Sequence, residues 1–185
     1  KGLIGFWAVH QDASGHAREL ALAYLAGIGS GEVGIFPTTF REETVSDLFG
    51  EQVVLVGGMV ALAKASFDRL VAAGVSPRMA YIDCVHEIKY LADLIQARGI
   101  AGMYEAISDT AEFGARQIED AIAGPELRRT FDKAMAAIED GSFARRWVET
   151  YEAGNAMTAD RARDRELPVE AAGAELRSRI YGDAK

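Results

Sequence analysis

Two long apolar segments constrain the fold of this chain more than any other feature of its sequence. Residues 53–73 are apolar, with small side chains on the facing positions. Residues 77–99 follow Ser76-Pro77, which is a helix N-cap followed by proline at the first helical position. Each segment exceeds 20 residues. A helix that is apolar around most of its circumference needs other helices on every side. The pattern therefore predicts long buried helices inside a helical bundle.

Most of the remaining sequence is also typical of helices. We expect one helix that ends near residue 27, a second that runs from residue 41 past residue 51, and a third that starts after Ser108. Three more helices are expected at residues 126–139, 143–152 and 169–180. Residues 100–107 are expected to break the helical pattern before Ser108, whose hydroxyl is placed to cap the next helix. Residues 33–40 are expected to be extended. Because almost no strand is expected after the opening residues, the predicted fold class is all-α.

The chain opens on an apolar, strand-like run at residues 3–9 that has no evident partner strand nearby. We therefore expect that residues 1–12 are the end of a domain that lies upstream, and that residues 13–185 form the helical domain. Whether the chain is a fragment or a shortened relative stays open.

The charge of the chain limits its partners. A formal net charge of -8 makes nucleic acid an unlikely ligand, since an acidic surface repels phosphate. Cys84 is the only cysteine, so an internal disulfide is impossible and a reducing cytoplasm is expected. No uninterrupted apolar run approaches the roughly 20 residues that span a bilayer, so no membrane association is expected.

Acidic residues recur at helical spacing in two places. Glu43, Asp47 and Glu51 follow one another at intervals of four, which puts three carboxylates on one helix face. Such clusters bind hard cations such as Mg²⁺ through oxygen. With 28 acidic residues in 185, several pairs at this spacing arise by chance, and most of them would be solvated helix faces. Both interpretations stay open for this cluster.

Asp83 and Glu87 form the second pair, within a mostly apolar helix. An unpaired carboxylate is costly to bury, and a divalent cation is one of few ways to stabilise it. His86 completes an Asp-x-x-His run similar to the Glu-x-x-His ligands of di-iron bundles, but those bundles need the motif on two helices. We therefore interpret His86 as a packing or outer-shell residue and Cys84 as a thiol of the core.

Several motifs in one order along the chain resemble ketol-acid reductoisomerases. They are VHQDASG at residues 9–15, TTFREET at 38–44, DLFGEQ at 47–52, CVHEIK at 84–89, ISDTAEFG at 107–114 and DGSFA at 140–144. Residues 169–177 also follow the tail of that family. The resemblance covers nearly the whole chain without large gaps.

This resemblance implies the C-terminal domain of the short-form enzyme, an all-α, knotted domain that forms an intertwined homodimer. The family joins a small-molecule ketol acid, two Mg²⁺ ions and NADPH, and produces a dihydroxy acid in the synthesis of branched-chain amino acids. Asp47 would bridge both metal ions and Glu51 would complete one of them. Asp83 and Glu87 would come from the partner subunit, as would Ser108, which would bind the substrate. Glu43 corresponds to a further acid of that site.

Two departures from the family accompany the resemblance. The family ordinarily has glutamate at the position of Asp83, and the shorter side chain is expected to weaken the second metal site. The NADPH-binding domain, with its catalytic histidine and lysine, precedes the segment where this chain opens, and residues 1–12 resemble its last strand. The chain alone is therefore expected to be inactive.

Two other readings compete with an enzyme half. The first is a non-catalytic dimerisation module that has lost its metal site. The second is an unrelated di-iron bundle, which the single Asp-x-x-His run does not favour.

Overall fold

The computed structural model describes residues 2–154 and 157–182. The chain forms two compact units, Lys1–Glu51 and Gln52–Lys185. This division differs from the expected boundary after residue 12, because the first helix and a second strand pack with the opening strand.

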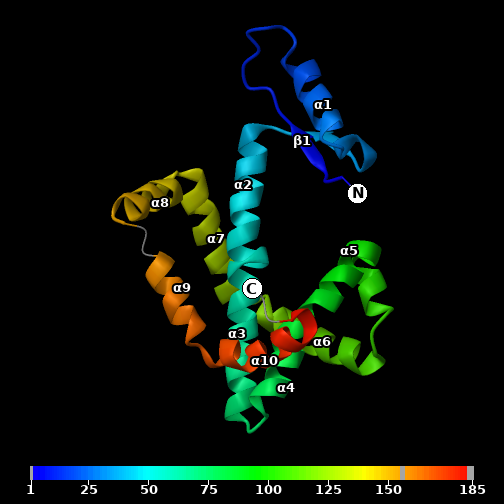
Figure 1. Cartoon of the computed structure of the whole chain (residues 1–185), viewed down its shortest axis with the longest axis vertical. Helices are drawn as coiled ribbons and strands as arrows, with labels where there is room; N and C mark the ends of the chain where they lie inside the picture. The colour runs from blue at the N-terminus through cyan, green and yellow to red at the C-terminus, as the bar shows by residue number, and fades with distance from the viewer. Residues whose placement is uncertain (1, 155–156, 183–185) are drawn as a thin grey trace. The chain divides into compact units, whose positions relative to one another are not determined.

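The first unit contains a small parallel sheet. Strand β1 (Gly5–Trp7) pairs with β2 (Ile35–Pro37), and helix α1 (Ala17–Gly27) connects them and packs on β1 (Figure 1). A 3-10 turn, Ser30–Glu32, precedes β2. The opening strand thus has a partner in this chain, and the expectation of none is wrong. Among the described residues β1 and β2 are the only strands, and the fold is all-α, as predicted.

Helix α2 (Phe40–Gly50) begins at a capped end and continues into an irregular turn. The Thr39 side chain accepts a hydrogen bond from the Glu42 backbone N–H. The π-helical turn η2 (Glu51–Leu55) follows α2, and α3 (Gly57–Ala72) follows η2. The predicted helices at residues 41–51 and 53–73 are therefore present, with a π turn between them. Such a turn has hydrogen bonds from residue i to i+5 instead of i+4.

The second predicted long helix is also interrupted. It consists of α4 (Pro77–Tyr81), the π turn η3 (Ile82–His86) and α5 (Ile88–Tyr104). The Ser76 side chain caps α4 by accepting from the Met79 N–H, as predicted. At Gly99 the helix is kinked, with φ 71° and ψ 177°, a conformation that essentially only glycine adopts. Helix then resumes, so the expected break across residues 100–107 is wrong for most of that range.

Five helices complete the described part of the second unit. They are α6 (Asp109–Ile122), α7 (Pro125–Glu139), α8 (Ser142–Glu152), α9 (Met157–Arg165) and α10 (Pro168–Tyr181). All but α9 were predicted. The α9 sequence, MTADRARDR, is mostly polar and contains no large apolar residue besides its first methionine, so it lacks the apolar periodicity from which the other helices are recognised.

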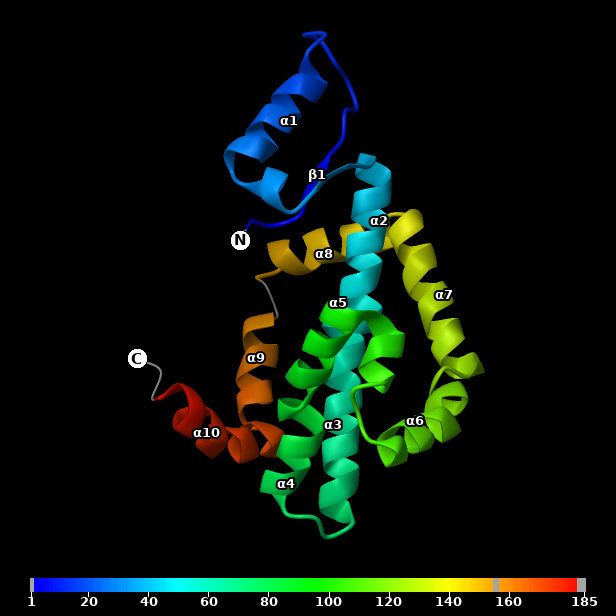
Figure 2. The same ribbon diagram turned by 90° about the vertical axis from the view of Figure 1, so that its right-hand side faces the viewer.

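The main core of the second unit lies where α3, α4 and α10 meet. Phe67, Ala80 and Tyr81 are buried there, and Val85 of η3 packs against them together with side chains of α10. Figures 1 and 2 both show α4 and α10 beside the C-terminal part of α3. This cluster holds the start of η3 in place.

Much of the long apolar helices is not covered within this chain. Leu55 is 61% exposed and Leu62 56% exposed. The covering on every side that the apolar pattern predicts is therefore not completed within this chain. A contiguous apolar face of this kind marks a protein interface or a membrane contact.

By length and composition alone, the helical run Phe40–Ala72 is able to cross a membrane. It has 33 residues, and its most apolar 18-residue window has a mean hydropathy of 1.5 with none of the window buried. This exceeds what the sequence pattern suggested, because such a window admits up to two charged residues, whereas the sequence was searched for an uninterrupted apolar run.

The core cluster makes a prediction about stability. Phe67 is 1% exposed, so Phe67→Ala should leave a cavity and lower the free energy of unfolding by about 3–5 kcal/mol. Phe67→Leu keeps most of the volume and should cost under about 1.5 kcal/mol. Denaturant titration of both variants measures the difference. Losses near zero for both variants would contradict the prediction.

Candidate functional site

The first acidic pair lies at the junction of α2 and η2. Asp47 is in the last turn of α2 and Glu51 is the first residue of η2. The Glu51 backbone N–H donates to the Asp47 carbonyl, so the two residues are one turn apart on one face. Both side chains are exposed. The structure thus brings this pair together, as its spacing predicts.

The second acidic pair lies at η3. Asp83 is inside this π turn and Glu87 directly follows it. The Glu87 N–H donates to the Ile82 carbonyl at 3.1 Å, a bond from residue i+5 to i. Both carboxylates are exposed. The expectation of buried acids is wrong here, because the apolar residues of this helix face the core and the acids lie on the open side.

Both pairs lie at π-helical turns. In the described part of the chain, η2 and η3 are the only such turns. A π turn adds one residue to a helical turn and is frequently found at functional sites. Sequence reasoning missed these turns, since an added residue leaves the four-residue spacing of the acids unchanged.

The four carboxylates have no partner of opposite charge. Within residues 2–154 and 157–182, none of Asp47, Glu51, Asp83 and Glu87 forms a hydrogen bond or an ion pair through its side chain. In the same residues no three His, Cys, Asp or Glu side chains are grouped closely enough to hold a metal ion. Each pair therefore offers part of a coordination shell. Free carboxylate oxygens without histidine are the donors that Mg²⁺ prefers.

Two neighbours of the second pair have roles in packing. The His86 Nε2 lies 3.2 Å from the Tyr90 hydroxyl, and the rings pack edge to face. Burial, and then the adjacent Asp83 carboxylate, raise the pKa of the Cys84 thiol. A raised pKa keeps the sulfur protonated at neutral pH, which argues against a nucleophilic role for Cys84.

Ser108 combines a structural contact with a free donor. Its Oγ accepts a hydrogen bond from the Ala111 N–H at 3.2 Å and so caps α6. The hydroxyl proton is not used in this contact, and among the described residues no hydrogen bond donated by the Ser108 hydroxyl is found. The side chain is exposed, so it is able to donate to a bound molecule.

Gln52 is a polar residue that the sequence did not single out. Its Nε2 is buried and has no hydrogen-bond partner in the described part of the chain. A buried donor without an acceptor costs about 1–3 kcal/mol. The sequence does offer one sign that Gln52 is special. It directly follows Glu51 and is the last polar residue before a long apolar run.

The surroundings of Glu43 differ from those of the two acidic pairs. It lines a cavity of about 770 Å³ within the first unit, and most of its other walls are apolar. The lining residues are Phe6, Trp7, Ala8, Ala21, Tyr24, Leu25, Thr38, Phe40 and Glu43. Glu43 is thus available to this cavity as well as to the acidic face of α2.

Comparison of the chain with known proteins identifies its family. The family described as "Ketol-acid reductoisomerase, C-terminal domain" matches residues 40–181, a range that contains both acidic pairs and Ser108. The chain belongs to this family. The predicted resemblance is therefore confirmed.

A solved structure supports the same assignment. It is that of an NADH-preferring ketol-acid reductoisomerase from an uncultured archean, with 44% sequence identity and a TM-score of 0.90. The match covers 95% of this chain and 54% of the other. The chain thus spans about half the length of that ketol-acid reductoisomerase.

The environment of Cys84 predicts a change in its reactivity. Asp83→Asn removes the charge that helps to raise the thiol pKa, so the pKa should fall and more thiolate should be present at a given pH. Alkylation by iodoacetamide at pH 8 should become about twofold faster. Glu87→Gln is the matched control, since the Glu87 charge does not contribute to the Cys84 shift, and it should leave the rate unchanged. A rate unaffected by Asp83→Asn would contradict the prediction.

Proposed function

We propose that this chain is the metal- and substrate-binding half of a Mg²⁺-dependent ketol-acid reductoisomerase. The observation that carries this proposal is the occurrence of two exposed, unpaired carboxylate pairs, each at a π turn, inside the residues that match the family. The reaction proposed is alkyl migration and reduction of 2-acetolactate or 2-aceto-2-hydroxybutyrate to a 2,3-dihydroxy acid.

The four carboxylates have separate tasks in this proposal. Asp47 and Glu51 would hold the Mg²⁺ ions from this subunit through their carboxylate oxygens. The partner subunit's Asp83 and the partner subunit's Glu87 would supply the remaining protein oxygens. Such ions, when bound, act as Lewis acids toward a neighbouring hydroxyl and ketone. Relief of like-charge repulsion within each pair favours cation binding, since such pairs cost a few tenths of a kcal/mol.

Ser108 would orient the substrate. Its oxygen is engaged by the helix cap, so its O–H direction is restricted, and a restricted donor is better placed to fix a substrate carboxylate or hydroxyl.

The nicotinamide cofactor would be bound by another part of the protein. The sequence predicts NADPH, whereas the similar solved enzyme prefers NADH. We therefore propose a reduced nicotinamide dinucleotide, and expect the choice between the two to depend on residues outside the range 40–181. Hydride transfer to the rearranged ketone is the chemistry that this cofactor supplies.

A second copy of the chain is the proposed cover for the exposed apolar helices. The uncovered face of α3 supports a large interface of the obligate kind, and the family resemblance implies a knotted, intertwined homodimer. The acidic charge does not favour nucleic acid. A single free thiol, Cys84, is compatible with the cytoplasm, which is the proposed location.

Calorimetric titration with Mg²⁺ tests the metal site directly. We expect Mg²⁺ to bind the full-length protein. Asp47→Asn should weaken this binding by more than roughly 100-fold, because loss of a residue that contacts only a metal ligand typically costs about 10–100-fold. Asp68→Asn, an exposed acid of α3 outside both pairs, is the control and should bind like the wild type. Mg²⁺ at 100 times its Kd should stabilise the fold by about 2.7 kcal/mol.

The opposite result has a defined meaning. A protein that neither binds Mg²⁺ nor gains thermal stability from it would be a dimerisation module without a metal site.

The short side chain of Asp83 gives a separate prediction. Asp83→Glu should tighten Mg²⁺ binding about threefold to tenfold, or roughly 0.6–1.4 kcal/mol, because the longer side chain reaches the ion directly. Asp93→Glu adds the same methylene on α5, where the acid is paired with Lys89, and should change nothing. Unchanged or weaker binding by Asp83→Glu would show that aspartate is not the limiting ligand.

A further inference from the structure

We infer that Tyr81, held by the C-terminal helix α10, is a positioning residue for the Asp83 carboxylate. This inference rests on the proposed function, since it assigns to α10 an influence on the second metal-binding pair. Tyr81 is the last residue of α4, and Asp83 is two residues further along, inside η3.

The Tyr81 ring is fixed from the side of α10. Its side chain is buried, with 8% exposed. Arg177 Nη1 donates to the Tyr81 hydroxyl at 3.1 Å. The same guanidinium is held by Glu170, whose carbonyl and Oε2 accept from Nη2 at 3.1 and 2.8 Å. The tyrosine hydroxyl is thus tied to two turns of α10.

Gly173 allows the helix to approach this closely. A Cβ at position 173 would lie 2.2 Å from Cε2 and 2.4 Å from Cζ of Tyr81. These are positions that no side chain tolerates, and both atoms belong to a buried ring that has no room to move. The contact between α10 and Tyr81 therefore requires glycine at this position.

Asp83 depends on its backbone for its position. Its side chain has no hydrogen bond or ion pair in the described residues, so η3 alone determines where its oxygens lie. The π turn η3 has a less regular hydrogen-bond pattern than an α-helix. It is held by Tyr81, the residue directly before it, and near its end by Val85. Because aspartate is short, it has little freedom to correct a displaced backbone.

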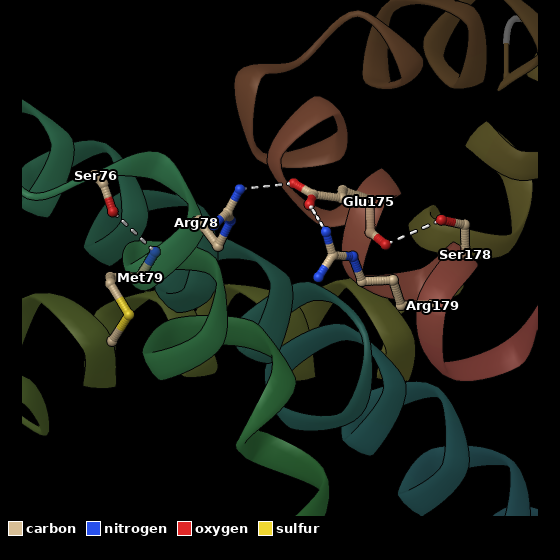
Figure 3. Close-up of polar contacts among 6 residues, drawn as sticks. All are labelled: Ser76, Arg78, Met79, Glu175, Ser178 and Arg179. Atoms are coloured by element: carbon tan, nitrogen blue, oxygen red, sulfur yellow. Dashed lines mark hydrogen bonds and ion pairs between the residues drawn. The ribbon is translucent and has the colours of Figure 1, made fainter.

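A second contact between α4 and α10 serves as a control. Arg78 Nη2 lies 3.0 Å from Glu175 Oε2, and Arg179 pairs with the other oxygen of Glu175 (Figure 3). The Arg78 side chain is 66% exposed, and exposed ion pairs contribute little to stability. Loss of this pair removes a link between the same two helices without touching Tyr81.

The test compares four substitutions by Mg²⁺ calorimetry on the full-length protein. Tyr81→Phe and Arg177→Met each remove the hydrogen bond, and each should weaken binding about threefold to tenfold, somewhat less than is usual for a direct partner of a ligand. Arg177→Lys keeps a donor and should restore part of the loss. Arg78→Met should bind Mg²⁺ like the wild type. Thermal unfolding of every variant is measured in parallel.

A double-mutant cycle separates positioning from a general structural role. If Tyr81 acts through Asp83, then Tyr81→Phe should cause no further loss of Mg²⁺ affinity in an Asp83→Asn background. An equal loss in both backgrounds would overturn the inference. So would a lowered Tm with unchanged affinity, since that result would make Tyr81 a packing residue only.

Failure of the proposed function gives a different result. In that case the wild type itself binds no Mg²⁺, whatever residue is at position 81. Wild-type binding together with unaffected variants would retain the metal site and reject only the role of Tyr81.

Discussion

The contact between α10 and Tyr81 is the interaction on which the second unit most depends. Among the described residues, the cluster of Phe67, Ala80 and Tyr81 is the one place where side chains from α3, α4 and the end of the chain are buried together. A helix of only five residues, α4, has no independent stability, so its position and that of η3 follow from this packing. Residues nearly a hundred positions apart thus determine where an acidic pair lies.

The acidic pairs of the candidate site lower the stability of the isolated chain. Its carboxylates repel one another within each pair, and the whole chain is already acidic, with a net charge of -8. Exposure to water keeps this cost small, so the fold tolerates the pairs without a cation. Removal of that water by a covering surface would raise the cost and strengthen the demand for a divalent ion. Under the proposed function, covering the site and binding the metal therefore favour each other.

Local signals in the sequence predicted local structure well. Ser76 and Ser108 cap helices as expected, because a cap depends only on neighbouring backbone N–H groups. The π turns were missed, since periodicity averages over an added residue. At Gly99, where the helix was expected to end, the helix kinks and continues. The exposure of Asp83 and Glu87 was also wrongly predicted. An apolar helix sequence shows that a surface must be covered, but it does not say whether the same chain covers it.

The same helical run carries both the first acidic pair and an uncovered apolar face. Asp47 and Glu51 precede a stretch in which Leu55 and Leu62 remain exposed, with only a π turn and its following residue between the acids and α3. A surface that packs on this face would therefore come to lie close to the carboxylates. If that surface belongs to a second copy of the chain, it brings a second set of the same acids, and neither set needs to be complete alone. The incomplete shell of each pair and the uncovered face of α3 then have one common explanation, in which assembly completes the site.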